Sequence, residues 1–303
     1  MNVYKYLILG TLLCVSHDSA LAMQEFEVSE SKELSSLQEL VIQVLEDFEE
    51  GYSLLRSKLK MFESLNRGDF DKILLTLSFK KLLSMRDENG NSFLHRAAKN
   101  NDSEFVKICI LVGLPIDEKN AEYKTPFVLA DEAGRTEVCE ILKINLNLLE
   151  FARSGNLDGV REVLQAKAYK AYIDVRDKWT STPLLWAVEQ RDAKIVQLLI
   201  IAGASVSSKK NNGMFPLLRA AYWGLEDIVG FLVVRACVDD VGPDNRTSLW
   251  WAACRGHVSV VQQLLAKGAD KTIKDTVFKY TALDIARENE HAAVVALLED
   301  QPA

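Results

Sequence analysis

The densest group of residues that could do chemistry is an acidic cluster near the N-terminus, formed by Glu46, Asp47, Glu49 and Glu50. Carboxylates this close in sequence could bind a divalent cation. The segment from residue 24 to 51 holds nine acidic residues and one basic residue, so the acidic excess of the chain, a formal net charge of −7, belongs to it. Solvated carboxylates on a helix face explain this pattern more simply. Enzymatic or metal-dependent activity in this segment is therefore our alternative interpretation.

The remaining reactive side chains do not form a recognisable site. No histidine pairs with a carboxylate or a cysteine at the spacing of a metal site. The sequence also lacks a glycine-rich phosphate loop, a Gly-x-Ser-x-Gly motif and an HExxH motif. Cys109, Cys139, Cys237 and Cys254 lie in apolar stretches, and we interpret them as small buried hydrophobic residues. We expect no catalytic residue, no cofactor and no metal.

The tryptophans are unevenly distributed, because all five lie between Trp179 and Trp251. Large aromatic side chains are enriched at the centres of protein interfaces. Trp186, Trp250 and Trp251 could instead pack between neighbouring helices. Whether these rings are exposed depends on the elements that carry them.

An internal repeat predicts those elements. A Thr/Ser-Pro-Leu-like start, a small residue and a later Val-x-x-Leu-Leu run recur at intervals of 32 to 34 residues within each run of copies. The copies begin near residues 92, 125, 182, 215, 247 and 281. Thr or Ser followed by Pro suits the N-cap and the first position of a helix. Each copy therefore predicts a pair of short helices.

One position between the two helices of each pair favours glycine, because it needs a left-handed backbone. Its occupants are Gly68, Asn101, Gly134, Gly155, Arg191, Gly224, Gly256 and Glu290. We call this series the glycine ladder. Arg191 and Glu290 should each be strained there by roughly 1 kcal/mol. Gly155 follows Gly134 by only 21 residues, which predicts that the helix pair starting near residue 147 lacks its preceding hairpin.

The pattern resembles the ankyrin repeat, most closely from Thr247 to Asp270, where a Gly-His step, a Val-Val-x-x-Leu-Leu run and a Lys-Gly-Ala-Asp exit all match. The resemblance covers residues 60–303. It implies an all-α fold, an ankyrin-repeat solenoid of about seven to eight helix pairs with hairpin loops. We expect the pairs near residues 60–83, 92–113, 125–144, 147–166, 182–203, 215–235, 247–268 and 281–299. His95, His257 and His291 then fall at structural positions of the family.

The resemblance also implies a binding surface, because hairpins and the exposed ends of first helices line the concave face in this family. The residues at those positions are Trp179, Met214, Tyr222, Trp223, Phe278 and Tyr280. We predict that they bind a protein partner. The alternative is that an irregular array buries these side chains against shifted hairpins.

Two N-terminal segments precede the repeats. Residues 1–22 combine Lys5, an apolar run from Tyr6 to Val15 and a small-residue site ending at Ala22, which is the pattern of a secretory signal peptide. Residues 23–59 have apolar residues at steps of three to four, which predicts an amphipathic helical cap on the first repeat. This segment could instead assemble homo-oligomers.

Together these features predict a non-catalytic protein interaction module that is exported to the periplasm or secreted, with no stable membrane insertion after signal cleavage. An ankyrin array behind a secretory signal resembles bacterial more than eukaryotic proteins. Nucleic acid is not an expected partner, because the isoelectric point is about 5.3.

Overall fold

The computed structural model describes residue 52 and residues 84–165 and 172–300. The chain divides into two units, residues 1–82 and 83–303, and the description below concerns the second unit. The predicted signal peptide, the acidic segment at 23–59 and the helix pair near 60–83 lie outside the described residues.

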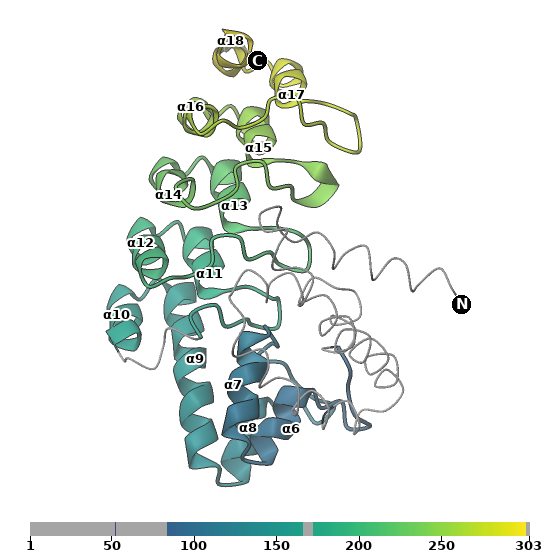
Figure 1. Ribbon diagram of the computed structural model, residues 1–303, viewed down its shortest axis with the longest axis vertical. Coiled ribbons are helices and arrows are strands. Elements are labelled where there is room, and N and C mark those ends of the chain that lie inside the picture. The colour runs from purple at the N-terminus through teal and green to yellow at the C-terminus, as the bar shows by residue number, and fades with distance from the viewer. Residues whose placement is uncertain (1–51, 53–83, 166–171, 301–303) are drawn as a thin grey trace, which may run out of the picture. The chain divides into compact units, whose positions relative to one another are not determined.

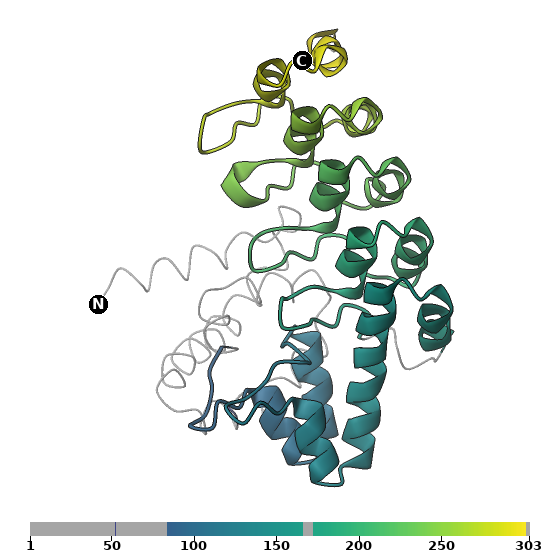
Figure 2. The same cartoon turned by 180° about the vertical axis from the view of Figure 1, so that it is seen from behind.

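In the described part of the second unit, short helices stack pair upon pair, with hairpin loops on one side (Figure 1 and Figure 2). The α-helices are α6 (Phe93–Lys99), α7 (Ser103–Leu111), α8 (Pro126–Glu132), α9 (Thr136–Ser154), α10 (Leu157–Gln165), α11 (Pro183–Glu189), α12 (Ala193–Ile201), α13 (Pro216–Trp223), α14 (Glu226–Leu232), α15 (Ser248–Arg255), α16 (Val258–Ala266), α17 (Ala282–Glu288) and α18 (Ala292–Asp300), with a 3-10 turn η2 (Pro243–Asn245). Within these residues no β-strand forms, and Val241 and Thr247 make a single isolated bridge. The predicted all-α solenoid is confirmed.

The helix starts follow the expected chemistry. The hydroxyls of Thr125, Thr182 and Thr247 each accept a hydrogen bond from the backbone N–H three residues later, at the N-termini of α8, α11 and α15. Proline occupies the first turn of α8, α11 and α13. Phe215 precedes α13 and offers no side-chain cap, so this start relies on proline alone.

The described positions of the glycine ladder all have a left-handed backbone. Their φ values lie between 58° and 73°, including the non-glycine residues Asn101, Arg191 and Glu290. Arg191 and Glu290 thus adopt the left-handed backbone from which their strain is predicted, because L-residues avoid this region of φ and ψ.

Two rows of helices form the core. The helices α11, α13, α15 and α17 contact one another in succession and form an inner row, and α10, α12, α14, α16 and α18 form an outer row. Ala187, Ala220 and Ala252 are fully buried on the inner helices, where a small side chain permits close approach. The hairpins project from the side of the inner row (Figure 1 and Figure 2).

Helix α9 differs from the prediction. The repeat spacing placed the end of one pair near residue 144 and the start of the next near 147, but residues 136–154 form one helix of 19 residues. It contacts α7 and α8 as well as α10 and α11 (Figure 1). Because no Pro or Gly interrupts the segment, nothing ends the helix between the two pairs. Its first half completes one pair, and its second half begins the next.

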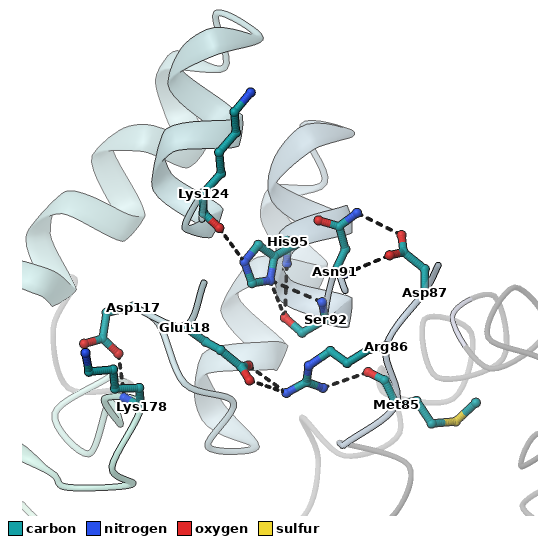
Figure 3. A network of polar contacts seen from close by, with 10 residues as sticks. All are labelled: Met85, Arg86, Asp87, Asn91, Ser92, His95, Asp117, Glu118, Lys124 and Lys178. Atoms are coloured by element: carbon teal, nitrogen blue, oxygen red, sulfur yellow. Dashed lines mark hydrogen bonds and ion pairs between the residues drawn. The ribbon is translucent and has the colours of Figure 1, made fainter. Parts of the chain in front are cut away.

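The hairpins on either side of α9 meet directly. The backbone N–H of Ile116 donates to the carbonyl of Arg176 at 2.9 Å, and the N–H of Lys178 donates to Asp117 Oδ1 at 2.6 Å (Figure 3). The second bond joins residues 61 positions apart, whereas the bond from Asn120 to Asn91, which joins the hairpin of Asp117 to the preceding hairpin, spans 29. The hairpin row therefore closes over the missing hairpin.

Candidate functional site

Six large aromatic residues of the inner row and its hairpins form two groups of touching rings, which we call the aromatic strip. Its members are Trp179, Trp186, Tyr222, Trp223, Trp250 and Trp251. The first group comes from α11 and the hairpin before it, and the second from α13 and α15. Because α11, α13 and α15 are successive inner helices, the strip follows the direction of the stack.

The second group is a continuous chain of ring contacts. Ring centroids lie 4.9 Å apart for Trp223 and Tyr222, 5.1 Å for Tyr222 and Trp251, and 5.0 Å for Trp251 and Trp250. The interplanar angles of 74° to 82° are edge-to-face arrangements, which the ring quadrupoles favour. Each ring thus holds its neighbour in place.

The first group is positioned by Asp177 in the hairpin. Its carboxylate accepts hydrogen bonds from the backbone N–H groups of Trp179 at 2.9 Å and Ser181 at 2.8 Å, and from Trp186 Nε1 at 2.8 Å. Thr180 adopts a φ of 59°, which turns the chain after Trp179. The Trp179 and Trp186 rings then meet edge to face at 6.0 Å.

An open pocket of about 470 Å³ adjoins this first group. It is lined by Trp179, Trp186, Lys210, Asn211 and Asn212, so aromatic faces, amides and one cation share it. Such a mixture suits an amphipathic side chain of a partner protein.

Cations lie over the faces of the strip. Arg191 is 4.5 Å from the Trp223 centroid, Arg255 is 4.3 Å from Tyr222, and Arg153 is 5.5 Å from Trp179 and 5.3 Å from Trp186. The further cation and ring pairs are Lys178 over Trp179, Lys210 over Trp186, and Arg246 over Trp250 and Trp251. Each contact is a cation–π interaction, so the strip is cationic as well as aromatic.

The predicted site residues differ in exposure. Trp179, Trp223 and Phe278 expose 48%, 38% and 62% of their surface, whereas Met214 and Tyr222 are half-buried. Met214 packs against the main core. The tryptophans expected to pack between neighbours split: Trp250 is buried, and Trp186 and Trp251 are half-buried.

Phe278 and Tyr280 form a separate aromatic pair in the hairpin before α17, with centroids 5.6 Å apart. Asp275 shapes this hairpin by accepting from the backbone N–H groups of Val277, Phe278 and Tyr280. Burial of the Asp275 carboxyl would raise its pKa, but these hydrogen bonds, led by that from Phe278, hold the pKa below its usual value.

The histidines connect neighbouring repeats. Ser92 donates through its backbone N–H to His95 Nδ1 at 3.2 Å, so His95 Nε2 carries the proton and donates to the carbonyl of Lys124 at 3.1 Å (Figure 3). Burial lowers the pKa of His95 and favours this neutral form. His257 and His291 make equivalent Nε2 contacts with the carbonyls of Tyr222 and Cys254.

Other chemistry is sparse in the described part of the chain. No three His, Cys, Asp or Glu side chains gather there in a way that could hold a metal ion. None of the helices described is both long and apolar enough to cross a membrane. Cys109 is buried as expected, Cys139 and Cys254 are half-buried, and the prediction of burial is wrong for Cys237, which is exposed.

Sequence reasoning missed one exposed ring and the cations. Tyr123 exposes 80% of its surface in the hairpin before α8. It lies two residues before the N-cap Thr125, as Thr180 lies before Thr182, and both have a φ near 60°. Counting back from the capping threonine would have placed Tyr123 in the hairpin.

Helix pairs, a left-handed ladder between them and stacked hairpins define an ankyrin-type repeat protein. A family model described as ankyrin repeats, in three copies, matches residues 148–241 and 234–302, which together make up half of the chain. The chain belongs to the ankyrin repeat family.

Its curated relatives include much longer eukaryotic proteins. The chain is 28% identical to the nuclear factor NF-kappa-B p105 subunit of Gallus gallus over 71% of its own length and 24% of the relative. It is 31% identical to the ankyrin repeat and KH domain-containing protein mask-1 of Caenorhabditis elegans, over 64% of its own length and 9% of the relative. It is 34% identical to ankyrin repeat and SOCS box protein 2 of Bos taurus, over 31% of its own length and 15% of the relative. The chain therefore spans less than a quarter of the length of each.

Proposed function

We propose that this chain is a non-catalytic binding protein that holds a protein partner against the aromatic strip and the neighbouring hairpins. The observation that carries the proposal is the exposure of Trp179 and Trp223, at 48% and 38%, within the aromatic strip that follows the stack. Exposed tryptophan is costly in water and is enriched among the residues that dominate binding energy.

The packing of the array supports this role. The inner and outer rows share one apolar cluster that reaches from α9 to α18. A repeat array of this kind presents a surface that needs little ordering when it binds, so less of the interaction energy is lost. The edge-to-face contacts of the strip add to this preorganisation.

Export is the second part of the proposal. The three-part signal pattern of residues 1–22 supports secretion or release into a bacterial periplasm. Export is tested by measuring the mass of the chain that is recovered from each cell fraction. We expect a mature N-terminus at Met23 outside the cytoplasm, and recovery of only the uncleaved chain from the cytosol would contradict export.

A capture experiment with paired variants tests the binding role. Replacing Trp179 and Trp223 by Ala should lower capture of the partner from a native extract by at least tenfold, because each removes an exposed anchor. The matched control replaces Ile201 and Val234, which are 70% and 69% exposed near the outer row. Circular dichroism should stay helical for both variants. Equal capture by both would remove the strip from consideration.

A further inference from the structure

Five of the cations that lie over the aromatic strip form no ion pair within the described residues, whereas Arg246 pairs with Asp244. Arg153, Lys178, Arg191, Lys210 and Arg255 each lie over an aromatic ring. In the parts of the chain that the structure describes, none of these five forms an ion pair. The strip thus gathers positive charge on a chain whose formal net charge is −7.

Three acidic residues of the inner row and its hairpins are already engaged. Asp177 accepts three hydrogen bonds within its hairpin group. Glu189 pairs with Arg219 at 2.6 Å, and Asp244 pairs with Arg246 at 3.5 Å. None of these three carboxylates is therefore available to neutralise the five cations.

We propose that the aromatic strip binds an extended acidic segment of its protein partner, with carboxylates that pair with Arg153, Arg191 and Arg255. This inference rests on the proposed binding function and names the chemistry of the partner. A guanidinium that lies over a ring can still donate from the N–H groups at its edge, and these match a carboxylate in a two-pronged geometry. Arg255 uses one of its nitrogens to donate to the Tyr222 hydroxyl, which leaves its remaining N–H groups for a carboxylate. Charge complementarity then selects an acidic partner.

The same contacts disfavour single-stranded nucleic acid. Proteins bind such strands by stacking bases on free aromatic faces. Here Arg191 lies over Trp223, Arg255 lies over Tyr222, and Tyr222 also makes edge-to-face contacts with Trp223 and Trp251. A base would have to displace these cations, whereas a carboxylate binds to them where they are.

The repeat spacing suggests the spacing of the acidic residues. Packed helices lie roughly 8–10 Å apart, which sets the step from one repeat to the next. Arg153 lies in the last turn of α9, Arg191 follows α11, and Arg255 ends α15, two inner helices after α11. A polyproline II segment has about three residues per turn and rises about 3.1 Å per residue, so every third side chain returns to one face after about 9 Å. A segment with Asp or Glu at every third position therefore places one carboxylate beside each repeat, including the repeats of Arg153, Arg191 and Arg255.

The test uses the full chain and a fluorescein-labelled peptide of five Glu-Pro-Pro triplets, followed by fluorescence anisotropy. The comparison peptide has the same composition with its five glutamates contiguous, and fluorescein-labelled oligothymidylate is the nucleic-acid probe. We expect the triplet peptide to bind at least tenfold more tightly than either.

Paired charge variants locate the binding surface. Replacing Arg191 and Arg255 by Gln should weaken binding of the triplet peptide by about tenfold. The matched control replaces Arg161 and Arg287, which are also exposed and lie over none of the described aromatic rings. Both double variants lose two positive charges, so a general charge effect would lower both affinities equally.

Several outcomes would overturn the inference: no binding of the triplet peptide, equal affinity for the contiguous peptide, tighter binding of oligothymidylate, or equal loss in the two double variants. Failure of this inference can be separated from failure of the proposed function. If the glutamate peptide does not bind but the tryptophan variant still loses its captured partner, only the acidic recognition is wrong.

Discussion

The array from α11 to α18 and the region around α9 differ in how consecutive helix pairs and their hairpins are arranged. From α11 onward each helix pair is preceded by its own hairpin or hairpin-like loop, and contacts between neighbouring loops join residues about 30 positions apart, as from Asn211 to Thr180 and from Asn245 to Lys274. Around α9 one hairpin is missing, two pairs share a single helix, and the contact from Lys178 to Asp117 spans 61 positions.

This difference shows that the helix rows and the hairpin row are stabilised separately. Leu148 and Ala152 of α9 belong to the apolar cluster that continues to α18, so the core passes through the irregular pair without interruption. Polar contacts from Asp117 and Ile116 close the hairpin row independently. A repeat can therefore lose its hairpin without breaking the stack, provided that both rows find new neighbours.

The largest expected effect comes from breaking α9. Proline in place of Asn147 removes a backbone donor and clashes with the carbonyl four residues earlier, which costs about 3 kcal/mol or more in a helix interior. Because all five tryptophans lie after α9, tryptophan fluorescence reports on the later repeats alone. In urea we expect an early loss of helical circular dichroism, with the fluorescence transition at higher denaturant.

The control for this experiment is Asn147→Ala, which keeps the helix and favours it slightly. It should unfold with coincident transitions at or above the urea midpoint of the unchanged protein. If Asn147→Pro left both transitions in place, the two pairs would not depend on a continuous helix, and the contrast between the regions would disappear.

The sequence predicted the regular region well because its signals are local. Capping threonines, prolines in the first turn and the left-handed positions act within a few residues, so Thr182 or Gly224 can be interpreted without knowledge of the fold. The repeat period predicts a break near residues 144–147, whereas the absence of Pro and Gly from Thr136 to Ser154 favours the continuous α9 that forms.

The candidate site was less predictable, for a physical reason. Exposed rings such as Trp179 and Phe278 follow from their place in a hairpin, which a repeat register gives. Several cations that cover the rings come from neighbouring repeats: Arg191 lies over Trp223, and Arg255 lies over Tyr222, 33 positions away in the sequence. Such pairings depend on how repeats stack, which no local pattern specifies.

A matched pair of glycines sharpens the comparison with an intermediate effect. Gly256 and Gly155 have φ values of 72° and 73°, but a Cβ on Gly256 would lie 2.8 Å from His291 Nδ1, whereas a Cβ on Gly155 would meet nothing within 4 Å. We expect Gly256→Ala to cost roughly 2–4 kcal/mol through strain and overlap, and Gly155→Ala roughly 1 kcal/mol through strain alone.

Urea midpoints of the two variants measure this difference. At Gly224 and Gly256, a histidine follows the ladder position of the next repeat and its ring lies against the glycine, whereas Asp192 occupies the corresponding position for Gly155. Equal destabilisation by the two substitutions would mean that the histidine contact adds nothing, and that strain alone distinguishes these positions.

The smallest expected effect concerns an exception within the regular array. Glu290 is exposed and has a φ of 58°, a backbone conformation that costs a residue with a side chain roughly 1–2 kcal/mol. Glycine at this position would avoid that strain, but the larger entropy that glycine loses on folding offsets roughly 0.5–1 kcal/mol of the gain. Glu290→Gly should therefore raise stability by about 0.5 kcal/mol. Glu288→Gly, two residues earlier at the end of α17, removes the same charge from a helical position and should lower stability. Thermal midpoints that move in opposite directions would show that backbone conformation governs the ladder, whereas a shift of the same sign in both variants would show that the lost charge governs it.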